Sequence, residues 1–147
     1  MKNMSLMLVL IVGLSGAPEA GPLTDEMSKC LVTNTSEADK TLFIQWLYAA
    51  ISSHPDVKSL SNISPEVGEN INRRAAELLL ELLTVKCKAE TEQAIEFEGK
   101  SSYRTSFGLL GRVSIQELLE HPQVAQYLAS LNSYFDAEKL KNIFDKR

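Results

Sequence analysis

Apolar residues recur at spacings of three and four along most of this chain, which is the spacing of one buried face of an α-helix. The stripes begin near residues 36, 64, 101, 122 and 136. No stretch alternates apolar and polar residues for long enough to indicate a strand. The pattern therefore predicts an all-α protein, a single-domain bundle of about five to seven helices.

Polar residues mark where several of these helices begin. Ser36 precedes an apolar stripe, and Asp39 stands where its carboxylate can reach back to Ser36 in a capping box. Ser64-Pro65 is a second start, since serine caps free N–H groups and proline fits the first helical turn. Ser114 begins another such box, so we expect a further helix to start there.

Two segments have less regular patterns. Residues 75–83 are apolar around much of a helical circumference, which is typical of a helix covered on more than one side. We expect Leu79 and Leu82 in this stretch to lie fully inside the bundle. The polar segment from Pro22 to Thr35 is predicted to be an extended arm or a loose helical turn, held in place by Cys30.

The two histidines occur in similar contexts, since His54-Pro55 and His121-Pro122 each follow an apolar helix and precede a valine. A duplicated helical pair would explain the similarity, and so would two copies of a common helix end, because proline disfavours a helical residue before it. We expect structural residues at helix ends and no shared metal or catalytic centre, since neither histidine has a second ligand at the spacing of a helical metal site.

The first residues have the order of a secretory signal peptide: Lys2, the apolar run Leu6–Leu14, and then small residues. We predict a signal peptide over residues 1–20 and one domain over residues 21–147, with cleavage after Ala20 or Gly16. The run is shorter than the roughly 20 residues that span a bilayer, so we expect no stable membrane anchor after cleavage. The predicted location is the periplasm in a Gram-negative bacterium, or otherwise the extracellular space.

Two cysteines, Cys30 and Cys87, remain after the predicted leader. Export to an oxidising compartment favours a disulfide between them, and two free thiols or a redox pair are the alternatives. The formal net charge of −4 makes nucleic acid an unfavourable partner.

Groups suited to catalysis are sparse. No Gly-x-Ser-x-Gly or His-Glu-x-x-His motif occurs, so we predict no catalytic residue, no metal ligand and no cofactor. The acidic stretch at residues 90–98 is interpreted as a solvated helix face. Aromatic side chains that can anchor a partner form the predicted interaction surface, namely Tyr48, Tyr103, Tyr134 and Phe135.

Two glycosylation sequons start at Asn34 and Asn62. Each immediately precedes a predicted helix, where Asn, Ser and Thr are expected as capping residues, and capping is the interpretation we prefer.

We therefore predict a non-enzymatic protein that binds another protein, of an inhibitor, immunity or adaptor type. The alternative is a carrier of a small apolar ligand between helices, for which a pocket lined by Phe43, Leu79 and Phe107 would be the mark. An enzyme without a recognisable motif is the third possibility.

Overall fold

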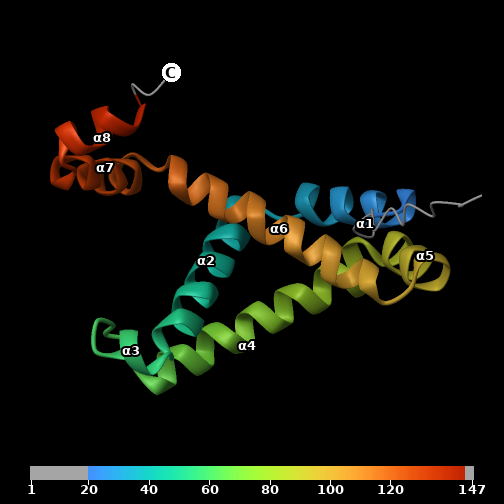
Figure 1. Ribbon diagram of the computed structural model, residues 1–147. Coiled ribbons are helices and arrows are strands. Elements are labelled where there is room, and N and C mark those ends of the chain that lie inside the picture. Colours follow the sequence, from blue (N-terminus) through green and yellow to red (C-terminus); the bar gives the residue numbers. More distant parts are fainter. Residues whose placement is uncertain (1–19, 145–147) are drawn as a thin grey trace, which may run out of the picture.

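The computed structural model describes residues 20–144, and this part of the chain is built from helices and short turns without a strand (Figure 1). In chain order the elements are α1 (Pro22–Thr33), α2 (Glu37–Ser52), α3 (Pro55–Lys58), α4 (Pro65–Glu81), the π-helical turn η1 (Leu82–Lys86), α5 (Lys88–Glu98), α6 (Ser101–Glu120), α7 (Pro122–Ser130), the 3₁₀ turn η2 (Leu131–Tyr134) and α8 (Ala137–Phe144). The predicted all-α class is confirmed. Residues 1–19 of the predicted signal peptide lie outside the described residues.

The helices form three parts. We call α1, η1, α5 and α6 the body, because they contact one another around a common core. Helices α2 and α4 pack against each other and project from the body as a hairpin, with α3 at its far end (Figure 1). We call α7, η2 and α8 the C-terminal arm, which extends beyond the end of α6 at a distance from α3 (Figure 1).

The core lies where α1, α6 and η1 meet. Met27, Leu31, Leu82 and Leu110 are each at most 1% exposed. Leu82 is therefore fully buried, as predicted, but Leu79 is only half-buried, so that part of the prediction is wrong. Helix α4 is covered by α2 and the body on one side, and the residues of its Leu-rich stretch that turn away from them reach solvent.

Cys30 on α1 and Cys87 after η1 form the predicted disulfide, with their Cα atoms 5.9 Å apart. Cys87 directly follows the π-helical turn. Its N–H donates to the carbonyl of Leu82, five residues back, at 2.8 Å, which is the hydrogen bond typical of a π-helix. Cys87 is fully buried within the hydrophobic core. The bond thus joins the first helix to the centre of the body.

The segment from Pro22 to Thr33 is a regular helix of 12 residues, so it is neither the extended arm nor the loose helical turn that was predicted. Its first turn is held by Glu98, whose carboxylate accepts the backbone N–H of Leu23 at 2.9 Å and the N–H of Thr24 at 2.8 Å. The Thr24 hydroxyl also donates to Glu98, at 2.6 Å. The Glu98 carboxylate of α5 therefore caps the N-terminus of α1, a role that a residue next to the helix usually fills.

The bonds from Thr24 and its neighbour Leu23 hold the pKa of Glu98 below its usual range. The Thr24 hydroxyl is the largest cause, and burial acts more weakly in the opposite direction. Gly21 leaves room for the carboxylate, because a Cβ at this position would collide with it. Glu98 is therefore a structural residue, in contrast to the solvated face predicted for the acidic stretch.

Helices α1 and α6 meet along a line of buried hydroxyl groups, which we call the hydroxyl seam (Thr24, Ser28, Ser102 and Ser106). The hydroxyl oxygens of Thr24 and Ser102 lie 2.8 Å apart, as do those of Ser28 and Ser106. Small side chains allow close approach of the helices, and mutual hydrogen bonds remove the cost of burying the hydroxyl groups. Because the apolar stripe of α1 is narrow, its periodicity alone did not predict a helix.

Two of the three helix starts predicted from serine caps are confirmed. Ser36 and Asp39 form the capping box of α2, and Ser64 accepts the N–H of Val67 at the start of α4. Ser114 instead lies in the middle of α6, where its hydroxyl donates to the carbonyl of Leu110 at 2.9 Å. Its side chain is buried against the rest of the protein, so a pattern typical of a cap occurs inside a helix.

Candidate functional site

Aromatic rings gather where α2 crosses α6. Phe43 and Trp46, one turn apart on α2, each meet the ring of Phe107 edge to face, with centroids 6.1 Å and 6.3 Å away. Tyr103 stacks on the other side of Phe107 at 6.1 Å. The indole N–H of Trp46 donates to Asn72 on α4 at 2.9 Å. The cluster thus fixes the angle between α2, α4 and α6.

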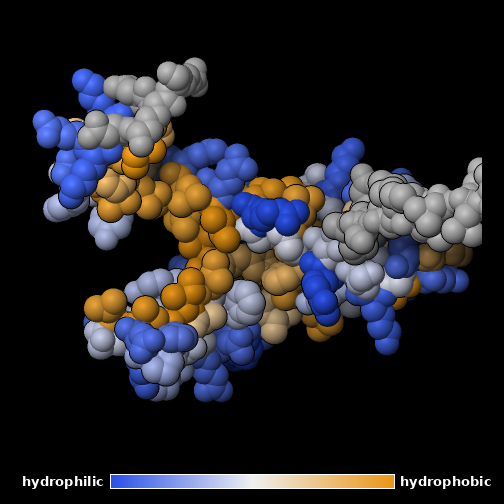
Figure 2. Space-filling model, in the orientation of Figure 1, coloured by the Kyte–Doolittle hydropathy of each residue, from blue (hydrophilic) through white to orange (hydrophobic). Residues whose placement is uncertain are grey.

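An apolar cleft of about 260 Å³ opens in the angle between α2 and α6. Its α2 wall includes Ile44 and Leu47, and its α6 wall includes Gly108, Gly111 and Ile115. A Cβ added at either glycine would meet no other atom within 4 Å, so the absence of two side chains widens the cleft. Figure 2 shows hydrophobic surface along this angle, on the side that faces the opening between the hairpin and the C-terminal arm.

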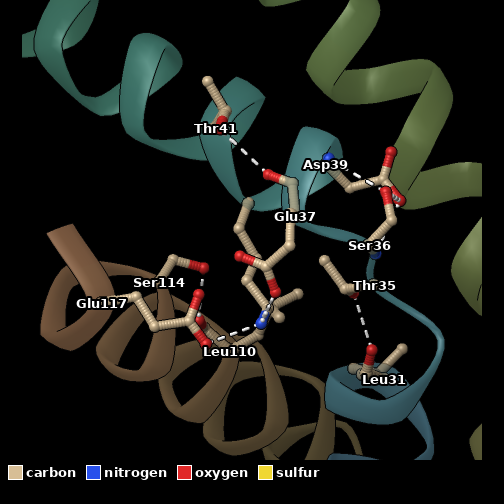
Figure 3. Close-up of polar contacts among 10 residues, drawn as sticks. Leu31, Thr35, Ser36, Glu37, Asp39, Thr41, Leu110, Ser114 and Glu117 are labelled. Carbon is tan, nitrogen blue, oxygen red and sulfur yellow. Dashed lines mark hydrogen bonds and ion pairs between the residues drawn. The ribbon is translucent and has the colours of Figure 1, made fainter. Parts of the chain in front are cut away.

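An ion pair joins the two walls near the start of α2. The Lys40 ammonium group lies 2.6 Å from the Glu117 carboxylate of α6 and 2.9 Å from that of Glu37 (Figure 3). The bond to Glu117 is the largest cause of a raised pKa for Lys40, followed by the bond to Glu37. Lys40 therefore remains charged at neutral pH and holds α2 against α6.

The structure distributes the four predicted interaction residues over separate surfaces. Tyr103 belongs to the aromatic cluster beside the cleft, whereas Tyr48 lines a shallow depression between α2 and α4. Tyr134 and Phe135 lie at the end of η2 in the C-terminal arm, where Tyr134 is 84% exposed. Only Tyr103 is close to the cleft, so these residues do not form one site.

The pocket that would support a carrier function, predicted to be lined by Phe43, Leu79 and Phe107, is found in part. Phe43 and Phe107 line the cleft, but Leu79 packs against the hydrophobic core instead. Gly108 and Gly111 are not among the site residues predicted from the sequence, where a glycine inside a helix indicates only a weaker helix. The sequence signal for the open α6 wall of the cleft is a pair of glycines, three residues apart, among the apolar residues of a helix.

His54 and His121 lie at two similar helix junctions. Each is the residue before the first helical proline, with φ and ψ of −67° and 134° at His54 and −61° and 129° at His121. His54 accepts the N–H of Asp56 through Nδ1 at 3.3 Å. Both side chains are exposed, at the far end of the hairpin and at the base of the arm. Within residues 20–144, no group of three His, Cys, Asp or Glu side chains is placed to hold a metal ion.

Comparisons with protein-family models, curated proteins and solved structures find no match for this chain. In the part of the chain that the structure describes, no helix is both long and apolar enough to cross a membrane.

Proposed function

We propose that this protein is an exported, non-enzymatic binding module that recognises another protein through the α2–α6 cleft. The observation that carries the proposal is the apolar cleft itself, which stays accessible because Gly108 and Gly111 have no side chains to fill it. A solvent-facing apolar cleft is a typical docking site for the apolar side chains of a partner helix or loop. An inhibitor, an immunity protein or an adaptor would use such a surface.

The size of the cleft favours a protein partner over a small molecule. Pockets that enclose a drug-sized ligand commonly measure roughly 300–1,000 Å³. At about 260 Å³ the cleft is smaller and suits a few inserted side chains. The aromatic cluster behind it provides the rigid apolar support that is characteristic of binding hot spots.

Export is part of the proposal because two independent features support it. The signal-like order of residues 1–20 is one, and the Cys30–Cys87 disulfide is the other, since such bonds persist in oxidising compartments.

A variant that fills the cleft tests the proposal. Gly111→Leu adds a side chain to an open position, so it should leave the fold intact and abolish capture of the partner when the protein is used as bait in the native secreted fraction. Ala89→Leu is the matched control, because it adds the same side chain at an exposed position of α5. Equal capture by Gly111→Leu and the wild type would refute the cleft as the binding site.

A carrier of a small apolar ligand is the second candidate, because the residues that line the cleft are almost all apolar. A fluorescent fatty-acid analogue distinguishes the two functions. Stoichiometric binding that is lost in Gly111→Leu would favour the carrier, whereas weak binding that is equal in both variants would favour the protein-binding module.

A further inference from the structure

The C-terminal arm lacks a core of its own. None of the side chains that the structure describes in α7 and α8 is buried, and Val124 and Leu140 are only half-buried. The two helices have 9 and 8 residues, and isolated helices shorter than about 12–15 residues are marginal in water. Among the described residues, α8 makes no close contact with any other helix, so the arm gives its own apolar side chains little cover within one chain.

The composition of the arm is that of an interface centre. Residues 122–135 include no Asp, Glu, Lys or Arg. Protein interfaces are depleted of charge at their centre and enriched in Tyr and Phe. The large apolar side chains that the arm exposes are Tyr127, Leu128, Leu131, Tyr134, Phe135, Ile143 and Phe144.

The exposed area matches what a dimer needs. These seven side chains are between 49% and 84% exposed. At roughly 200 Å² for a large apolar residue, they present about 900 Å² on each copy. A standard stable interface buries about 800 Å² on each partner. An interface between two identical arms would therefore reach the standard size when it covers nearly all of this apolar surface.

The charges of α8 are ordered in a self-complementary way. Asp136 and Glu138 stand at its start, and Lys139 and Lys141 follow. Asp136 pairs with Lys139 of its own chain at 3.5 Å, so when two such helices lie antiparallel about a twofold axis, Glu138 of one can face Lys141 of the other. A partner with a strongly acidic or a strongly basic surface would find no complementary charge here, since the centre of the arm is uncharged.

We propose that two copies of this chain form a twofold dimer by packing their C-terminal arms against each other. No residue of the arm lines the α2–α6 cleft of its own chain. The dimer leaves both α2–α6 clefts open, so this inference is independent of the proposed binding function.

The experiment measures the mass of the whole chain, expressed with its leader and purified as the cell processes it, by sedimentation and light scattering. The wild type is expected at twice the chain mass. Leu131→Glu should weaken the dimer by roughly 100-fold or more, since it places a charge in an apolar interface. Tyr127→Glu should act in the same way. Both positions are exposed in the single chain, so circular dichroism should show at most a small loss of helix content, no larger than the short helices of the arm.

Two controls separate the arm from other surfaces. Leu80→Glu places the same charge on α4 at a position 62% exposed, close to the 59% of Leu131, and should leave the dimer intact. Ile115→Glu places it in the cleft and should also leave the dimer intact.

Other outcomes would overturn the proposal. A wild type that stays monomeric at millimolar concentration would do so, and so would a dimer that persists in both arm variants. Dissociation by Ile115→Glu would show that the arm occupies the cleft of the second copy instead. A monomer that binds phosphatidylglycerol vesicles, and loses that binding in Leu131→Glu, would assign the arm to a lipid surface.

Discussion

Small hydroxyl side chains such as Ser28 and Ser106 are buried in the body, whereas the large ring of Tyr134 lies in solvent in the C-terminal arm. In the body, the four hydroxyl groups of the seam each have a hydrogen-bond partner, and the apolar residues beside the seam are covered. In the arm, apolar side chains have no such cover within one chain. The comparison teaches that stability is concentrated in the body, and that the arm contributes little to the stability of a single chain.

Loss of the disulfide should have the largest effect on the body. In the chain-entropy model, a cross-link between residues separated by 57 positions contributes about 4 kcal/mol. The double variant Cys30→Ser/Cys87→Ser should therefore unfold at a much lower denaturant concentration than the oxidised wild type. Reduced wild type is the control, and it should match the variant. A variant as stable as the oxidised protein would show that the body does not depend on this link.

Truncation of one leucine in each region tests the comparison directly. Leu82→Ala should lower the free energy of unfolding by about 2–5 kcal/mol, because its side chain is fully buried. Leu131→Ala should change it by about 0.5 kcal/mol or less at a concentration where the chain is monomeric. Urea titration gives both values. Similar losses at the two positions would mean that the arm has a core within one chain.

The hydroxyl seam should be the next most sensitive feature. Ser106→Ala removes the hydroxyl group that lies 2.8 Å from that of Ser28, and it should cost about 0.5–1.5 kcal/mol, the worth of one ordinary hydrogen bond, since Ser28 still donates to the carbonyl of Thr24. Ser101→Ala on the exposed side of the same helix is the matched control. A stabilised Ser106→Ala protein would indicate that the seam serves close packing and not hydrogen bonding.

A pH series tests the cap that Glu98 provides. The folded pKa of Glu98 is lowered, so its contribution is complete above the ordinary Glu value near 4.3 and is lost as the pH falls through the lower folded value. The melting temperature of the wild type should therefore fall in this acid range, and Glu98→Gln should flatten that fall.

Glu96→Gln on an exposed part of the same helix is the control for the pH series, and it should retain the pH profile of the wild type. An unchanged profile in Glu98→Gln would show that the bonds to α1 add nothing to the acid sensitivity of the body.

Local signals were enough to predict part of this architecture. Ser36 and Ser64 act on N–H groups a few residues away, and the stripe that follows each is apolar. Helix α1 escaped prediction because its cap, Glu98, is supplied from more than 70 positions further along the chain. Its buried face is also partly polar, so hydropathy does not mark it.

The candidate site was harder to predict for a related reason. The cleft depends on the crossing of α2 and α6, and on side chains that are missing at Gly108 and Gly111. A sequence shows a glycine as a weak helix former, but only the packed structure shows which surface it opens. The apolar character of the arm was visible in the sequence, but the absence of cover was not.

The pairing of α1 with α6 in the hydroxyl seam also sets an order of folding. Helix α1 is synthesised before every other described helix, yet its partners Ser102 and Ser106 follow 78 positions later. Contacts of such long range form slowly, because a large loop must close first. The seam therefore stays open until α6 has emerged, even though α1 can already contact η1 and α5. The arm follows α6 along the chain, so it emerges only after every helix of the body.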